Sequence, residues 1–276
     1  MDLLTYQGGS QTKKLFTTLV FISDTHIPYE DKKAIEVVLK FLKDFQPDYI
    51  LLGGDLIDFY SISKFNKDPK RALETQDDLD KLYEFLKKIR DICPNSIILY
   101  FKGNHENRLR TYKWTKCPEL AYLRCLTPEK LFRLAELDIQ WIEKRWQYGK
   151  LWFMHGSKLS VHSGDSARKN RDDCGTNVVH GHSHRTGKSN LTNLGGNAGG
   201  WESGCLCDLN PEYIEGVANW QHGLTVVQDF GGKIFHTDNI DIVKHSFLFG
   251  QKLYTLNQKW EDEYNNYMSQ LSGISG

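Results

Sequence analysis

Five short apolar segments, each followed at once by a polar or glycine-containing motif, constrain this chain more than any other feature. They cover residues 19–22, 49–52, 97–101, 152–154 and 178–179. Segments this short and continuously apolar are typical of strands in a sheet that is buried on both faces. Amphipathic helical patterns at 32–45 and 75–92 separate the first three segments. The alternation predicts a layered α/β fold whose functional loops gather at the carboxyl ends of the strands.

The later part of the chain adds less regular elements. Residues 224–230 and 233–236 flank a pair of glycines and predict a β-hairpin, so we expect a mixed sheet. Residues 118–137 predict a helical cap, and the glycine-rich stretch 195–204 predicts a loop. We expect one domain over residues 1–250, followed by a polar, weakly helical tail over 251–276.

Composition bounds the function without choosing one. The 276 residues can bury a substantial core, and 35 basic residues balance 35 acidic residues, so a polyanion would have to be bound by a local patch. Residues 1–14 lack the pattern of a secretory signal, and no apolar run is long enough to cross a bilayer. These features predict a cytoplasmic protein without membrane attachment, and they leave its oligomeric state open.

The six cysteines show no C-x-x-C spacing and are expected to be reduced thiols. Cys205 and Cys207 form a C-x-C pair that could bind a soft metal ion. A single C-x-C without a second pair favours a structural role for these thiols.

The motifs after the five segments carry the functional signal. Each motif alone is explained equally well by a turn or a helix cap. Together they supply the carboxylate, amide and imidazole donors that Mn, Fe, Zn and Ni ions accept. Two such ions held roughly 3.5–4 Å apart can stabilise a phosphoryl group and generate hydroxide at neutral pH. The candidate ligands are Asp24, His26, Asp55, Asn104, His155, His182 and His184.

The type and order of the motifs resemble those of the calcineurin-like metallophosphoesterase superfamily. The motifs are Asp24-x-His26, Gly54-Asp55-x-x-Asp58, Gly103-Asn104-His105-Glu106, His155-Gly156 and Gly181-His182-x-His184. The resemblance implies a layered α/β/β/α sandwich in which helices flank mixed β-sheets. It also implies hydrolysis of a phosphate ester by attack of a metal-bridging hydroxide.

The resemblance further implies a role for each residue. Asp55 would bridge the two ions and His105 would assist the leaving group as a general acid or hydrogen-bond donor. Asp58 would pair with His105 and raise its pKa, although a turn or helix-cap role for Asp58 remains an alternative. The first ion would be held by Asp24, His26 and His184. The second would be held by Asn104, His155 and His182.

Cofactor and substrate are less constrained. We expect two divalent metal ions, with manganese favoured and iron, zinc, nickel and cobalt compatible with the same donors. Arg108 could bind a substrate phosphate through its guanidinium or pair with an acid on its own helix. Residues 156–190 are mildly basic, and aromatic residues near the motifs could stack on a base, although a role in the core is the more common alternative for several of them. Those aromatic residues are Phe59, Tyr60, Phe65, Tyr112, Trp114 and Trp201.

A basic and aromatic rim favours a phosphodiesterase or nuclease acting on nucleotides or nucleic acid. The alternatives are a phosphomonoesterase and a Ser/Thr protein phosphatase, whose Gly-Asn-His-Glu motif is similar. Residues 56–60 lack the arginine and glycine that such phosphatases carry after the second aspartate. A non-catalytic metal-binding scaffold is disfavoured because no ligand of the set is missing.

Overall fold

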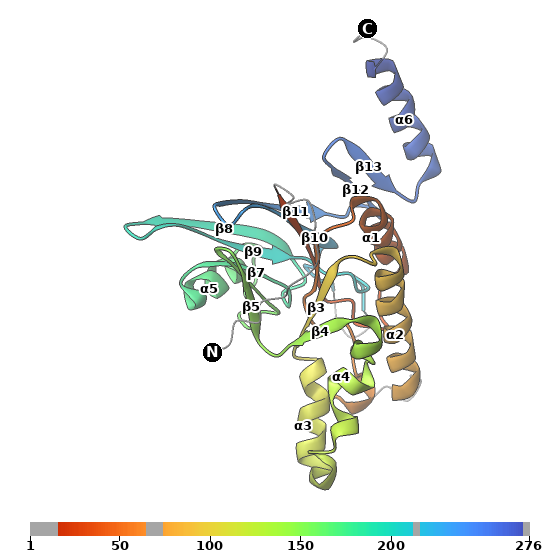
Figure 1. The fold of residues 1–276 in the computed structure, drawn as a ribbon, viewed down its shortest axis with the longest axis vertical. Helices are drawn as coiled ribbons and strands as arrows, with labels where there is room; N and C mark the ends of the chain where they lie inside the picture. Colours follow the sequence, from red (N-terminus) through yellow and green to blue (C-terminus); the bar gives the residue numbers. More distant parts are fainter. Residues whose placement is uncertain (1–15, 65–73, 212–215, 273–276) are drawn as a thin grey trace.

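The computed structural model describes residues 16–64, 74–211 and 216–272, which form two stacked sheets with helices on both outer faces (Figure 1). In the first sheet β1–β4 are parallel, and β10 is antiparallel to both of its neighbours. The sheet is therefore mixed, as the sequence predicted. Its spatial order is β11 (Ile234–Asp241), β10 (Gly223–Phe230), β1 (Thr17–Ile22), β2 (Tyr49–Leu52), β3 (Ile97–Phe101) and β4 (Ile139–Ile142).

The second sheet is also mixed. Its central strands β6, β7 and β9 are parallel, while β5 and β8 are antiparallel at the two edges. Its spatial order is β5 (Arg145–Tyr148), β6 (Leu151–Met154), β7 (Asn177–His180), β9 (Gly196–Ser203) and β8 (Thr186–Asn193).

Alternation of side chains along β1 builds the two hydrophobic cores. Val20 and Ile22 belong to the core under α1 (Lys32–Phe45) and α2 (Thr75–Ile92), on the outer face of the first sheet. Leu19 and Phe21 point the other way, into the core between the two sheets. Helix α5 (Asp165–Cys174) covers the second sheet. Because successive strand residues face opposite sides, continuously apolar strands bury both faces, and the predicted α/β/β/α layering is confirmed.

One element was predicted wrongly. The glycine-rich stretch 195–204 is not a loop, because residues 196–203 form β9 in the interior of the second sheet. A Cβ on Gly200 would lie 2.3 Å from the carbonyl oxygen of Ala167 in α5, and a Cβ on Gly199 would lie 2.2 Å from the Trp201 ring. Glycine is needed here for close packing of helix and strand rather than for a turn.

The segment expected to form a helical cap is broken into short turns. It follows α3 (Glu106–Lys116) in the chain. Phe132 in this segment packs against Tyr100 of β3 and closes one end of the core. The turns are η2 (Pro118–Leu120), η3 (Arg124–Leu126), α4 (Pro128–Leu131) and η4 (Leu134–Leu137). Elsewhere, a short 3-10 turn, η1 (Tyr60–Ile62), precedes α2.

The C-terminal part adds a hairpin and a helix. Strands β12 (Ser246–Phe249) and β13 (Lys252–Thr255) pair, and Phe247 and Tyr254 pack on Phe41 of α1. The boundary expected at residue 250 lies in the turn of this hairpin. Beyond it, α6 (Gln258–Ser272) extends away from the sheets (Figure 1). None of the helices in the described ranges has the length and apolarity to cross a membrane.

Candidate metal centre

The loops after β1, β2, β3, β6 and β7 meet at the carboxyl ends of parallel strands from both sheets. The Asp24 backbone N–H donates to the Gly54 carbonyl at 3.0 Å, which joins the first two loops. The His182 N–H donates to Asp24 Oδ2 at 2.9 Å, which joins the two sheets. The seven candidate ligands predicted from the sequence are therefore brought together in one place.

The first triad consists of Asp24, His26 and His184. The two Nε2 atoms of the histidines lie 3.1 Å apart, and Asp24 Oδ1 lies 3.3 Å from that of His184 and 3.9 Å from that of His26. Asp24 Oδ2 accepts hydrogen bonds from the Ser23 hydroxyl and the His182 N–H. Asp24 Oδ1 is buried and has no hydrogen-bond partner among the described residues. An unpartnered carboxylate oxygen beside two facing imidazole nitrogens fits a divalent cation.

The second triad is centred on His155. Its Nε2 lies 3.0 Å from Asn104 Oδ1, 3.1 Å from His182 Nδ1 and 3.2 Å from Asp55 Oδ2. Its Nδ1–H donates to the Gly53 carbonyl at 2.8 Å. That bond fixes the tautomer and turns the Nε2 lone pair toward the other donors, as in metal-binding histidines.

Asp55 lies between the two triads. A carboxylate oxygen of Asp55 lies within 4.8 Å of ring nitrogens of His155 and His182. A carboxylate oxygen of Asp55 also lies within 4.8 Å of ring nitrogens of His26 and His105. This position fits the bridging role that the sequence motif implied.

The backbone at this site is strained in a consistent way. Five of the candidate ligands have φ between 52° and 68°, a left-handed region that residues with a Cβ rarely adopt. Such conformations persist only where the surrounding structure holds them, and they cluster at functional sites. These residues are Asp24, His26, Asp55, His182 and His184.

Electrostatics follow from burial and neighbouring charges. Burial raises the pKa values of Asp55 and Asp58, but nearby histidines outweigh it and hold both well below the usual range. Burial lowers the pKa of His155, but the charge of Asp55 outweighs it and raises that pKa to about 9. Burial lowers the pKa of His182 to about 4, and the charge of His155 adds to the effect. The carboxylates therefore draw positive charge into the site, while His182 stays neutral as a metal ligand must.

His105 lies beside the two triads and is held by the loop after β2. Its backbone N–H donates to Asp55 Oδ1 at 2.8 Å, and its Nδ1–H donates to the Asp58 carbonyl at 2.9 Å, with Asp58 Oδ2 at 3.3 Å from the same nitrogen. Asp58 also accepts a hydrogen bond from His26 Nδ1 at 3.1 Å. One carboxylate thus contacts both the first triad and the candidate acid.

Arg108 completes this group. Its Nη1 donates to the Asp58 carboxylate at 3.1 Å, and its Nη2 donates to His105 Nε2 at 3.0 Å. Arg108 therefore pairs with an acid, although that acid belongs to the loop after β2 and not to its own helix.

Comparison with known proteins now identifies the family. The family model described as calcineurin-like phosphoesterase matches residues 17–243. The chain belongs to this family. As a calcineurin-like phosphoesterase it is a hydrolase of phosphate esters, and the family implies divalent metal ions.

Two phage proteins are similar to this phosphoesterase in sequence. The gene 54 protein of Mycobacterium phage L5 is 29% identical over 224 residues, covering 76% of this chain and 88% of that protein. The gene 54 protein of Mycobacterium phage D29 is 28% identical over 231 residues, covering 78% of this chain and 90% of that protein.

The chain is less similar to proteins of solved structure. Vacuolar protein sorting 29 from Cryptosporidium parvum has a TM-score of 0.49 and 13% identity, covering 88% of this chain and all of that chain (100%). The E. coli phosphoesterase Yfce has a TM-score of 0.35 and 15% identity, covering 78% of this chain and 92% of that chain.

Glu106 is a residue of this phosphoesterase to which the sequence motif gave no role. Its buried carboxylate accepts backbone N–H bonds from Asp55 and Leu56 at 2.9 Å each and from Gly103 at 2.8 Å. The Tyr100 hydroxyl donates to it as well. Glu106 thereby locks the loops after β2 and β3 to each other, which fixes the bridging carboxylate.

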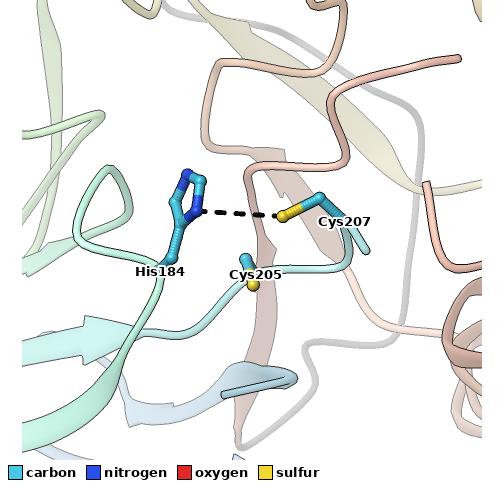
Figure 2. A group of neighbouring side chains, drawn as sticks. All are labelled: His184, Cys205 and Cys207. Atoms are coloured by element: carbon cyan, nitrogen blue, oxygen red, sulfur yellow. Dashed lines mark hydrogen bonds between the residues drawn. The ribbon is translucent and has the colours of Figure 1, made fainter. Parts of the chain in front are cut away.

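Cys207 and Trp220 also contact the metal centre of this phosphoesterase. Cys207 Sγ lies 3.8 Å from His184 Nδ1, the ring nitrogen that faces away from Asp24 (Figure 2). The Trp220 ring lies 4.3 Å from the His184 ring, centroid to centroid. The C-x-C spacing had marked Cys207 as a possible metal-binding thiol. Nothing in the sequence indicated the contact of Trp220 with His184.

The expected substrate rim is only partly present. Phe59 and Trp201 are buried in the cores, so they cannot stack on a base, and Phe65 lies outside the described residues. In the stretch 156–190, Lys158 and Arg168 pair with acids of α5. Part of the positive charge of that stretch is therefore neutralised within the stretch itself.

Proposed function

We propose that this chain is a dinuclear-metal hydrolase that cleaves phosphodiesters in nucleotides or nucleic acid. The observation that carries the proposal is the convergence of a complete nitrogen and oxygen donor set in two triads that share Asp55. Asp24, His26 and His184 would hold one ion. Asn104, His155 and His182 would hold the other. Manganese suits these mixed donors, and iron, zinc, nickel and cobalt would compete for them.

Two bound divalent ions supply Lewis acidity to the phosphate and lower the pKa of water enough for attack at neutral pH. The chain's own residues handle the leaving group. His105 is fixed through Nδ1 by Asp58, so its Nε2 is the atom that can donate a proton to the departing oxygen. The Asp58 carboxylate, 3.3 Å from the same Nδ1, would help to hold the ring in this orientation.

Arg108 would change partners when substrate binds. Its N–H now occupies His105 Nε2. A substrate oxygen that takes this place leaves the guanidinium beside the phosphate, where a planar fork of donors suits two phosphate oxygens. Arg108 would then bind substrate while remaining anchored to Asp58.

Helix α3 supports a nucleic-acid substrate over a small one. It starts next to His105 and carries four basic residues against one acid. Tyr112 and Trp114 are 39% and 56% exposed, and the Arg110 guanidinium lies over the Trp114 ring at 5.2 Å. Exposed aromatic rings between positive charges are what a single strand uses for stacking and phosphate contacts.

A panel of substrates with Mn²⁺-reconstituted protein tests the proposal. We expect turnover of bis(p-nitrophenyl) phosphate and of single-stranded DNA, with slower hydrolysis of p-nitrophenyl phosphate. The double variant Arg110→Gln with Trp114→Ala should raise KM for DNA and leave the chromogenic diester unaffected. Tyr122→Ala, at a side chain that is 90% exposed beyond α3, serves as the matched control.

Other results would redirect the assignment. Turnover of monoesters alone would make the chain a phosphomonoesterase, and preference for a phosphopeptide would make it a protein phosphatase. Tight metal binding without any turnover would identify a scaffold.

A further inference from the structure

A second cluster of metal-binding side chains shares no residue with the metal centre. Asp31 Oδ2 lies 3.0 Å from His245 Nε2 and 3.8 Å from His222 Nε2. The three residues come from separate parts of the chain: the start of α1, the residue before β10, and the turn before β12. All three donor atoms lie within 4.8 Å of one another.

Each side chain contributes one donor atom to this cluster. Asp31 Oδ1 caps α1 by accepting the N–H groups of Lys33 at 2.9 Å and Ala34 at 3.0 Å, so Oδ2 is left for the histidines. His222 is 6% exposed and directs Nε2 to the Cys207 carbonyl at 2.8 Å. That carbonyl is a further oxygen donor beside the cluster.

The turn that carries His245 is unusual for its sequence. Val243 and Ser246 exchange both backbone hydrogen bonds, and the two residues between them, Lys244 and His245, have φ of 51° and 56°. Two-residue turns with positive φ at both positions favour asparagine and glycine. A lysine and a histidine are strained there, and the strain places His245 against Asp31.

We propose that Asp31, His222 and His245 bind a further divalent transition-metal ion, outside the metal centre. One carboxylate oxygen and two imidazole nitrogens are a donor set that Zn²⁺, Co²⁺ and Ni²⁺ accept, and the Cys207 carbonyl can add an oxygen. His222 would bind through Nε2 with its proton moved to Nδ1, which exchanges its hydrogen bond to Cys207 for the metal. The ion ties the turn before β12 to the start of α1.

Metal counting tests this site directly. Protein stripped with chelator, reloaded with Zn²⁺ and desalted is assayed for bound zinc by mass spectrometry. Asp31→Asn keeps the helix cap and removes the charge, and His245→Asn tolerates the positive φ. Both variants should hold one equivalent less than the unmodified protein, and Zn²⁺ should raise their melting temperature less.

His236→Asn is the matched control. His236 Nε2 lies 2.9 Å from Asp238 Oδ1, but the histidine is 69% exposed on β11 and forms only this pair among the described residues. This variant should hold as much zinc as the unmodified protein.

Zinc lost from this cluster must also be distinguished from zinc lost from the metal centre. In a His155→Ala background, Asp31→Asn should still remove one equivalent, because the sites share no ligand. Equal zinc content with and without Asp31→Asn would overturn the proposal and leave a hydrogen-bonded cluster. Loss that disappears in the His155→Ala background would also overturn it, since the effect would then come from the metal centre.

Discussion

The two triads of the metal centre differ in what surrounds them. The first is enclosed: Asp24, His26 and His184 are all buried, and the outer nitrogens of the two histidines contact side chains. The second is open, because Asn104 is exposed and His182 is only half-buried. The first triad contains a carboxylate of its own, whereas the second relies on a neutral amide. If two ions bind as proposed, we expect the ion of the first triad to be held firmly and the ion of the second triad to exchange and to face the substrate.

Asp55→Asn tests whether the two triads act as one centre, and it should have the largest effect. Asp55 is the residue that both triads contact, so losing its charge should weaken the binding of both ions and reduce turnover to background. Phosphodiesterase rate and bound metal are measured together. Asp238→Asn, the same change at an exposed ion pair on β11, should alter neither. Undiminished activity would separate the triads and refute a shared centre.

His105→Ala asks whether the chemistry can be separated from both triads. Because His105 contacts Asp55 through its backbone N–H, removing the ring should leave that bond in place. We expect the rate to fall by about 10²–10⁴-fold, as for loss of a general acid. The metal content should stay unchanged, and loss of metal would make His105 a ligand instead.

The contrast between the enclosed and open triads predicts different costs in folding. In metal-free protein, His26→Ala leaves Asp24 and Asp58 short of a buried partner, which should cost about 3 kcal/mol of unfolding free energy. Asn104→Ala, at an exposed position, should cost less than about 1 kcal/mol. Urea denaturation in excess chelator measures both. Equal costs would show that the two triads are equally enclosed.

The pH dependence of the metal-free protein gives a smaller signal. The pKa of His155 is raised to about 9, so its stabilising contribution is full below its usual pKa and is lost as pH rises through 9. The pKa values of Asp55 and Asp58 are lowered, so their contributions are present above their usual range and lost in acid. The pKa of His182 is lowered to about 4, so its contribution is present above its usual pKa and is lost as pH falls toward 4. Stability should therefore be greatest near about pH 6.5.

Bound metal should oppose the loss of stability that the metal-free protein shows at alkaline pH. Since an ion displaces the proton from His155, affinity should grow as pH rises. Melting temperatures from about pH 6.5 to pH 9 should fall in chelator and hold or rise in Mn²⁺. A fall of similar size in both conditions would show that His155 does not exchange its proton for metal.

The gathering of the motif loops was predictable from sequence because each loop follows an apolar strand, whereas the division of the ligands into two triads came from the resemblance to the family. Helices α1 and α2 have the predicted bounds, and strands β2 and β3 end where expected, since continuous apolar runs leave few alternative registers. The prediction of 195–204 as a loop was wrong because glycine was taken as a turn former. Only the packing of α5 shows why Gly200 belongs in a strand.

The surroundings of the first triad could not be predicted in the same way. Cys207 and Trp220 lie 23 and 36 residues after His184, in a stretch without helical or strand periodicity. Their contacts with His184 arise from tertiary packing. In this packing the Leu206 N–H donates to the Asp24 carbonyl at 3.1 Å, which keeps the stretch next to the first triad. Local pattern carries no record of such contacts.

Cys207→Ala tests the enclosure of the first triad at its weakest contact. The thiol contacts the outer nitrogen of His184, so its loss should let the ring rotate. Affinity for the more tightly bound ion should then fall by about 10-fold, which is the lower end of the range for loss of a hydrogen-bond partner of a metal ligand. Cys93→Ala is the matched control, because Cys93 is also buried and its Sγ donates to the Leu42 carbonyl at 3.4 Å, away from the metal centre. Both variants create a similar cavity, so a difference between them in a competition assay against a chromophoric chelator measures the contact itself. If both lower affinity equally, packing alone maintains His184, and the enclosure of the first triad owes nothing specific to the thiol.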